Sequence, residues 1–252
     1  MPSHYLWTWA TTHLLPTVKR GDWRTASRMI RVAASNKAYN LLRDLKAGGW
    51  YGGYKPPRWK GAHGALSSDY RALDQMLVAF TNKKEPVVDV GSGRGRVLRW
   101  LLDHGYERII GVEIDTDLAF DSMWHFRNES SFQVEIVPGS IIDVLRPEWR
   151  QFYAFNPFDI ETTVTWLMRL RLLHPEGGVS IIYYNPRLDL EAMEPEYEVH
   201  QGVLDCKAGL TNVAILNLRP ITALRSHSGT QADDSQAPPA PTESGSTGIP
   251  SS

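Results

Sequence analysis

Residues 85–100, EPVVDVGSGRGRVLRW, constrain the fold of this chain more than any other segment. The apolar, mostly β-branched run at 86–90 is typical of a buried strand, and from Val97 onward apolar residues recur at helical spacing. Between them, glycines at 91, 93 and 95 let the backbone approach a ligand closely, and the following helix directs unpaired amide groups at the same space. The segment therefore predicts a strand, a glycine turn and a helix around a nucleotide-like cofactor.

The spacing and charge of the turn decide between cofactor classes. A dinucleotide fingerprint requires a third glycine at position 96, and a phosphate-binding loop requires a lysine there, but the chain has Arg96. Asp89 adds a carboxylate two residues before the first glycine, which disfavours a pyrophosphate and favours a cation. These features argue against a nicotinamide oxidoreductase and for S-adenosyl-L-methionine, which carries an ammonium and a sulfonium.

The motif VVDVGSGRGRVL at 87–98 resembles the first motif of class I S-adenosylmethionine-dependent methyltransferases. In that family the acid at the Asp89 position lies near the methionine end of the cofactor, and the glycines lie beneath it. The resemblance implies a cofactor-binding set in this part of the chain, consisting of Asp89, Gly91, Ser92, Gly93 and Gly95.

Two later positions extend the predicted cofactor site. Glu113 ends an apolar segment 22 residues after Gly91, close to the ~20 residues expected for an acid that binds ribose hydroxyls. A third predicted strand, 132–137, is followed by the loop that holds adenine in the family, with Ser140 where an acid is common. Ser140 can supply a hydroxyl there, and Asp143 is an alternative source of the acid.

The stretch QFYAFNPF at 151–158 is the second distinctive motif. It resembles the fourth motif of amino-directed methyltransferases, Asn-Pro-Pro-Tyr/Phe, which lies beside the transferring methyl group. The resemblance implies that Asn156, Pro157 and Phe158 are catalytic and that Asn156 also adjoins the cofactor. An asparagine amide can orient a substrate N–H or O–H, and the proline fixes the turn.

The N-terminal part of the chain differs in charge from the rest. Residues 1–60 carry 11 Lys and Arg against two acids, a net charge of +9, so the remaining residues have a net charge of −10. Residues 22–46 have the pattern of a basic amphipathic helix. This helix either docks onto the acidic catalytic domain, or contacts an anionic surface such as membrane lipid, or binds nucleic acid.

The segment 48–61, GGWYGGYKPPRWKG, combines glycines and prolines with four large aromatic residues and is predicted to be a loop or lid. In class I methyltransferases the segment before the first strand often covers the site. Candidate substrate contacts are therefore Trp50, Tyr51, Tyr54 and Tyr70. A loop packed by its own aromatic side chains is the alternative.

These features together predict an α/β protein with a Rossmann-like, seven-stranded, mostly parallel sheet that ends in an antiparallel hairpin. The predicted parts are a basic extension and lid (1–61), a methyltransferase domain (62–220) and a disordered tail (221–252). The single cysteine and the scattered histidines predict neither disulfides nor a metal site. A chain with a single cysteine fits a reducing compartment, which predicts a cytoplasmic protein. The lack of a long apolar run predicts that it has no transmembrane segment.

The predicted function is methyl transfer from S-adenosyl-L-methionine to an N or O atom of an unidentified acceptor, with a small molecule or protein favoured over nucleic acid. Asp159, His63 and Tyr153 are possible proton acceptors, and the sequence does not rank them. The alternative function is a non-catalytic S-adenosylmethionine-binding module that acts through its basic helix. An enzyme would turn over the cofactor, whereas a binding module would not.

Overall fold

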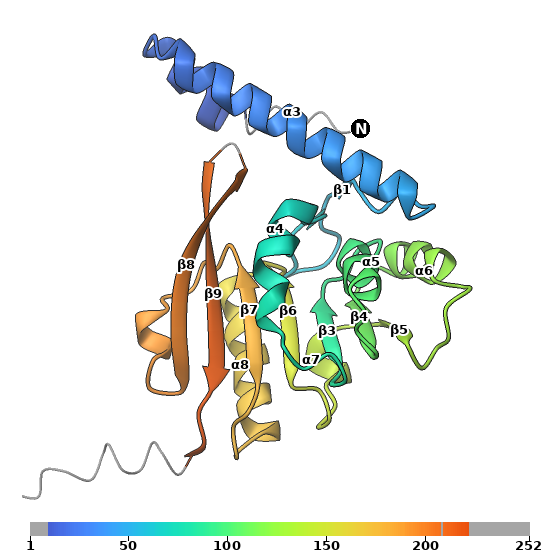
Figure 1. The fold of residues 1–252 in the computed structure, drawn as a ribbon. Coiled ribbons are helices and arrows are strands. Elements are labelled where there is room, and N and C mark those ends of the chain that lie inside the picture. Colours follow the sequence, from blue (N-terminus) through green and yellow to red (C-terminus); the bar gives the residue numbers. More distant parts are fainter. Residues whose placement is uncertain (1–9, 208, 222–252) are drawn as a thin grey trace, which may run out of the picture.

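The computed structural model describes residues 10–207 and 209–221, and its core is one seven-stranded sheet with the order β5-β4-β3-β6-β7-β9-β8 (Figure 1). Strands β3 to β7 are parallel, and β9 and β8 form the antiparallel end of the sheet. The strands are β3 (Val87–Val90), β4 (Ile109–Glu113), β5 (Val134–Pro138), β6 (Gln151–Phe155), β7 (Ser180–Tyr184), β8 (Tyr197–Lys207) and β9 (Gly209–Leu218). The predicted fold class is confirmed.

Helices cover both faces of this sheet and bury an apolar layer on each. They are α4 (Tyr70–Met76) with the 3₁₀ turn η2 (Leu77–Ala79), α5 (Arg96–Asp103), α6 (Thr116–His125), α7 (Ile141–Val144), α8 (Ile160–Leu173) and the 3₁₀ turn η3 (Glu191–Met193). Side chains alternate between the two layers along each strand, so Val87 joins the cluster that contains α4 and α5 residues while Val88 joins the α8 cluster.

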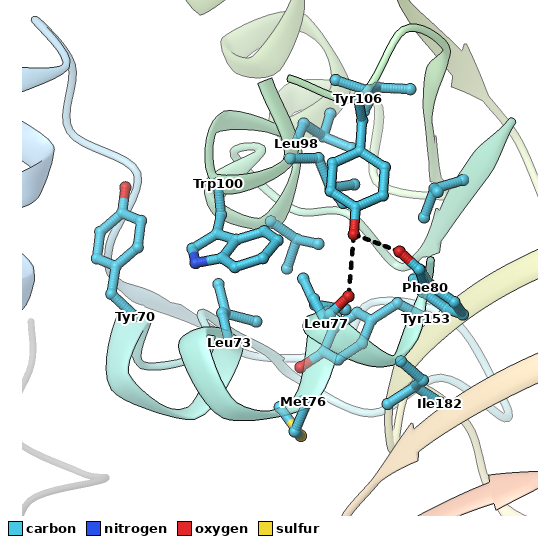
Figure 2. Close-up of a cluster of buried hydrophobic side chains, with 14 of the residues drawn as sticks. Tyr70, Leu73, Met76, Leu77, Phe80, Leu98, Trp100, Tyr106, Tyr153 and Ile182 are labelled. Atoms are coloured by element: carbon cyan, nitrogen blue, oxygen red, sulfur yellow. Dashed lines mark hydrogen bonds between the residues drawn. The ribbon is translucent and has the colours of Figure 1, made fainter. Parts of the chain in front are cut away.

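Figure 2 shows the first of these layers, in which large aromatic side chains fix α4 against α5. The buried hydroxyl of Tyr106 donates to the carbonyl oxygens of Leu77 and Phe80 at 3.0 and 2.8 Å. The indole N–H of Trp100 donates to Asp74 at 2.7 Å. Because their polar atoms are paired, these rings are buried without loss of hydrogen bonds. They fix the position of α5, the helix that follows the glycine turn.

The predicted basic helix is present as α3 (Trp23–Lys46), preceded by a π-helical turn η1 (Ala10–Leu14) and α2 (Leu15–Lys19). Asp22 caps α3 by accepting the Thr25 amide at 3.0 Å. In Figure 1 the helix lies across the end of the sheet at which the parallel strands finish. It therefore docks onto the α/β domain, on the side where ligands bind in open α/β sheets.

A short hairpin, β1 (Tyr54–Lys55) paired with β2 (Ala65–Leu66), connects α3 to the α/β domain. The predicted domain boundary at residue 61 falls inside this hairpin. The predicted disordered tail lies, except for residue 221, outside the described residues. Within residues 10–207 and 209–221, no helix is long and apolar enough to cross a bilayer, and no group of three metal-ligating side chains is present.

Candidate functional site

A cavity of about 320 Å³ opens at the carboxyl ends of β3, β4 and β6, between the glycine turn and the β1–β2 hairpin. Its walls come from the predicted motifs and from the lid. Lining residues from the predicted sets are Asp89, Gly91, Ser92, Gly93, Glu113, Ser140, Pro157 and Phe158. Residues 60–68, which include His63, form the lid side.

The three glycines of the turn all have positive φ, with values of 76°, 56° and 86° at Gly91, Gly93 and Gly95. A Cβ on Gly91 would lie 3.3 Å from Pro157, and one on Gly93 would enter open space. Gly95 does not line the cavity, and its contact with the cofactor stays a prediction. A Cβ there would lie 2.6 Å from the Phe126 ring, so this glycine is required for the packing of α5 against α6.

Glu113 holds the glycine turn from the end of β4. Its carboxylate accepts the amide of Gly93 at 2.7 Å and the amide of Asp115 at 2.9 Å. The side chain is buried, and this burial raises its pKa. A carboxylate accepts about four hydrogen bonds, so Glu113 keeps acceptor capacity for a ligand hydroxyl.

Asp89 is the most unusual charge in the site. It is 3% exposed, and its Oδ2 has no hydrogen-bond partner among the residues that the structure describes. Burial, reinforced by the nearby negative charge of Glu113, raises the pKa of Asp89 well above its usual range. A buried carboxylate without a partner is costly, and a bound cation would remove that cost.

The acceptor side of the cavity is built by the end of β6 and by the lid. Pro157 and Phe158 line the cavity and Asn156 does not, so the placement of the Asn156 amide beside the reacting atoms stays a prediction. Asn156 has φ +39°, and this left-handed turn carries the chain from β6 to Pro157. Its carbonyl oxygen lies 2.9 Å from Nδ1 of His63, whose amide donates to Pro157 O at 2.8 Å.

This contact fixes the protonation pattern of His63. A carbonyl oxygen only accepts hydrogen bonds, so Nδ1 must carry a hydrogen, and in the neutral ring Nε2 is then the nitrogen with the free lone pair. The other two predicted proton acceptors are less suited. Burial raises the pKa of Tyr153 well above its usual range, and its hydroxyl is paired with Ser68 at 2.7 Å. Hydrogen bonds from Thr162, which Asp159 accepts as the cap of α8, lower the pKa of that carboxyl.

Two aromatic residues predicted to contact substrate are instead in the core. Tyr51 is 2% exposed and its ring lies 4.6 Å from that of His125, and Tyr70 is 1% exposed beneath α3. Trp50 and Tyr54 are exposed, and neither lines the cavity. The ring of Tyr51 therefore stabilises the attachment of this loop to α6. Within the described residues 48–61, it does not pack against the loop's own aromatic side chains, as the alternative prediction proposed.

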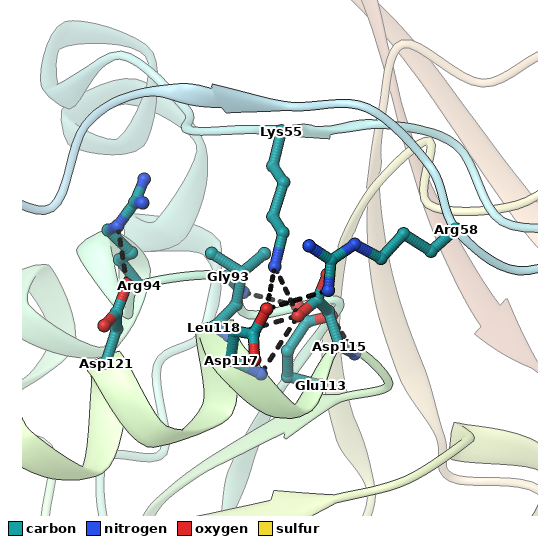
Figure 3. Close-up of polar contacts among 9 residues, drawn as sticks. All are labelled: Lys55, Arg58, Gly93, Arg94, Glu113, Asp115, Asp117, Leu118 and Asp121. Atoms are coloured by element: carbon teal, nitrogen blue, oxygen red, sulfur yellow. Dashed lines mark hydrogen bonds and ion pairs between the residues drawn. The ribbon is translucent and has the colours of Figure 1, made fainter.

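The lid is held over the cavity by ion pairs that have no local signal in the sequence. Lys55 contacts Asp115 at 2.6 Å and Asp117 at 3.0 Å, and Arg58 contacts Asp117 at 2.8 Å (Figure 3). Asp115 also caps α6, two residues after Glu113 at the end of β4. The partners are about 60 residues apart in the chain, so only the fold brings them together.

Ser140 lines the cavity where adenine is expected and caps α7 by accepting the Ile142 amide at 3.3 Å. Asp143, the alternative acid, is exposed and lies outside the cavity wall. The carboxylate in this part of the site is therefore Glu113, and the loop after β5 supplies a hydroxyl and apolar surface.

Replacing Glu113 with alanine should weaken binding of S-adenosyl-L-methionine by about 1.5–3 kcal/mol, the scale of hydrogen bonds to a charged group. The change removes both the predicted ribose contact and the acceptor that holds Gly93. Isothermal calorimetry measures the loss, with exposed Glu161→Ala on α8 as the matched control. Equal affinities of Glu113→Ala and the parent would remove Glu113 from the site.

No family model matches the chain. Over 124 residues it is 23% identical to a protein described as "Probable ribosomal RNA small subunit methyltransferase A" from Methanosarcina mazei. The aligned residues cover 49% of this chain and 43% of that relative. The chain therefore spans less than half the length of this relative.

Solved structures show the same fold. A "putative RNA methyltransferase" from Pyrococcus horikoshii matches with a TM-score of 0.50 and 13% identity, over 71% of this chain and 97% of the other. A cofactor-bound structure of Rv0187 from MTB matches with a TM-score of 0.50 and 17% identity, over 74% and 90% of the two chains. The predicted class I methyltransferase fold is confirmed.

Proposed function

We propose that this chain transfers a methyl group from S-adenosyl-L-methionine to an N or O atom of an acceptor. The observation that carries the proposal is Asp89, a buried carboxylate whose Oδ2 has no hydrogen-bond partner among the described residues, at the edge of a cavity floored by a glycine turn. Dinucleotides and nucleoside triphosphates present phosphates to such a turn, whereas this site requires a cation. The ammonium of S-adenosyl-L-methionine meets that requirement.

The residues present fit the cofactor along the whole cavity. Asp89 and the glycine turn would hold its methionine end, Glu113 its ribose, and the loop that contains Ser140 its adenine. When bound, the cofactor supplies a methyl group on a sulfonium, which is a strong electrophile. The protein therefore contributes mainly alignment of the acceptor atom and removal of its proton, and alignment alone supplies up to ~7–11 kcal/mol.

His63 is the residue we assign to proton removal. In the neutral ring Nε2 carries the free lone pair, because Nδ1 donates to the carbonyl oxygen of Asn156. In this arrangement Asn156 and Pro157 position the base through their main-chain oxygens, and Phe158 forms the adjoining apolar wall. A positioned base favours the enzyme over the non-catalytic module, because binding of cofactor alone requires no proton acceptor.

The acceptor class remains part of the proposal. The sequence favours a small molecule or a protein, while a relative and several matching structures are described as RNA methyltransferases. Lys60 and His63 on the lid side of the cavity are compatible with an anionic or polar acceptor. We therefore place RNA first in the acceptor screen, followed by proteins and small molecules.

Calorimetric titration with S-adenosyl-L-methionine, followed by transfer of a radiolabelled methyl group to these acceptors, tests the proposal. We expect micromolar or tighter binding and label in one acceptor class. A chain that binds the cofactor but labels nothing, with S-adenosyl-L-homocysteine never released, would support the binding module. A chain that does not bind the cofactor would refute both functions.

Replacing His63 with glutamine should lower turnover by about 100-fold, the lower end of the effect of a positioned base, because a sulfonium needs little activation of its partner. Cofactor affinity should stay within about threefold, since no cofactor contact is assigned to His63. The pH dependence of turnover should also flatten. His200→Gln, at an exposed position on β8, is the matched control. Unchanged turnover and pH profile in His63→Gln would exclude His63 as the base.

A further inference from the structure

The outward side of α3 is the largest feature of the fold that methyl transfer does not explain. A surface helix usually buries its apolar stripe and exposes its polar side. Here the arrangement is reversed, because the buried positions are mostly polar, whereas large apolar side chains face solvent. The exposed apolar residues, with their exposed fractions, are Trp23 (67%), Ile30 (52%), Leu41 (39%), Leu42 (65%) and Leu45 (62%).

The inward side is fixed by specific polar contacts, so the helix cannot roll to bury its apolar side. Asn40 donates to Asp69 at 2.6 Å and accepts the amide of Tyr70 at 2.9 Å. Asn36 accepts from Arg71 at 2.7 Å. These residues are buried or half-buried, and leaving their groups unpaired would be costly. The apolar side is therefore presented outward in the folded protein.

The exposed apolar residues are accompanied by cations. Exposed basic side chains on α3 are Arg24, Arg28, Arg31, Lys37 and Lys46, and Asp22 at the cap is the exposed acid. Residues 1–60 as a whole have a net charge of +9, and the remainder of the chain has −10. The molecule thus has a basic, partly apolar face on one side of an acidic body, a distribution that orients it toward an anionic surface.

Three kinds of partner can be compared with this face. Nucleic acid binds basic residues through its phosphates but leaves a row of leucines and isoleucine without a function. A second copy of the chain would cover the apolar residues but would bring two faces of like charge together. An anionic lipid surface satisfies both features, because acyl chains take up apolar side chains while headgroups attract Lys and Arg.

We propose that the outward face of α3 binds anionic membrane lipid, with the helix lying in the plane of the interface. At 24 residues, α3 is ~36 Å long. Trp23 at one end and Leu42 with Leu45 near the other insert at the headgroup boundary, and the basic residues contact the headgroups. The catalytic domain stays on the aqueous side, because it holds α3 by the opposite face. This inference does not depend on methyl transfer.

Cosedimentation of the full chain with vesicles tests the proposal. The vesicles contain phosphatidylcholine alone or with about 30 mol % phosphatidylglycerol, an anionic lipid. We expect binding to the anionic vesicles, at least tenfold weaker binding to the neutral ones, and release when salt rises from about 0.1 to about 1 M, which shortens the Debye length from ~10 to ~3 Å.

Two sets of variants separate the apolar and the basic contributions. Leu42→Gln/Leu45→Gln should weaken binding to anionic vesicles at least tenfold, and Arg24→Gln/Arg31→Gln/Lys37→Gln by about 100-fold. The matched control, Phe120→Gln/Leu172→Gln, removes side chains of similar exposure from α6 and α8 and should bind as the parent does. Unchanged calorimetric affinity for S-adenosyl-L-methionine in all variants shows that the fold is intact.

Four results would overturn the proposal. Binding of the parent to neither vesicle is the simplest. Binding to single-stranded RNA that the basic variant loses and the leucine variant keeps, without vesicle binding, would assign the face to nucleic acid. A dimer in sedimentation velocity that dissociates in Leu42→Gln/Leu45→Gln, again without vesicle binding, would assign it to a second copy. Vesicle binding that arises only after deletion of residues 2–9 would show that this segment covers the face.

Discussion

Replacing Asp89 with asparagine should raise the melting temperature of the cofactor-free protein and at the same time weaken S-adenosyl-L-methionine binding by about 100-fold, or ~3 kcal/mol. The two effects have one cause. In the cofactor-free protein the Asp89 carboxylate is buried, lacks a partner on Oδ2 among the described residues and lies near Glu113. A neutral amide of the same shape removes that cost, and it also removes the charge that would pair with the cofactor's ammonium.

The pH dependence follows from the direction of the pKa shift. Burial, followed by the charge of Glu113, raises the pKa of Asp89, so the folded protein binds the proton more tightly than the unfolded chain does. The contribution of Asp89 to the stability of the cofactor-free protein should therefore be fully present below the usual aspartate range and should be lost as pH rises through the raised pKa. Asp89→Asn should show a smaller fall, since position 89 no longer titrates.

Scanning calorimetry across pH and isothermal titration measure the two effects. Asp143→Asn is the matched control, because Asp143 is exposed and lies outside the cavity wall. S-adenosyl-L-homocysteine adds a further test. It keeps the ammonium and lacks the sulfonium, so equal losses of affinity for both ligands would assign Asp89 to the ammonium. A variant that melts below the parent, or binds the cofactor equally well, would contradict the assignment.

The central part of the fold could be predicted because its signals are local. The change from an apolar strand to glycines and then to a helical pattern occupies residues 85–100, and β3 and α5 form there. Glu113 could be predicted from its distance to Gly91, because one βαβ connection fixes that spacing. The terminal hairpin, β8 with β9, follows from alternating residues on both sides of a turn.

The remaining features depend on residues that are distant in the chain. Gly95 is required by Phe126, and the position of Asn156 follows from a left-handed turn whose carbonyl binds His63, 93 residues away. The exposed side of α3 could not be predicted from its sequence pattern. Helical spacing shows that the helix has an apolar and a polar side, but not which of the two packs against the rest of the protein. Its partners, among them Asp69 and Arg71, lie about 30 residues or more along the chain.

Replacing Asp44 with alanine should lower the free energy of unfolding by about 3–5 kcal/mol, a large part of the stability of a domain this size. Asp44 is 1% exposed on the inward side of α3 and pairs with Arg96, which is 7% exposed. Its two carboxylate oxygens accept from Arg96 at 2.6 and 3.3 Å, and a third guanidinium nitrogen donates to the Ser68 carbonyl at 3.2 Å. Without Asp44, a buried guanidinium would keep its charge and lose its counter-ion.

Urea unfolding of Asp44→Ala, Arg96→Met and the double variant Asp44→Leu/Arg96→Met separates the causes. A buried ion pair replaced by apolar residues of similar volume often costs little, so the double variant should be more stable than Asp44→Ala. Since Arg96 directly follows Gly95 and lines the cavity, we expect Asp44→Ala also to weaken cofactor binding. A loss below about 1 kcal/mol, the scale of an exposed pair, would mean that α3 is held by its asparagine contacts and that the cofactor turn does not depend on it.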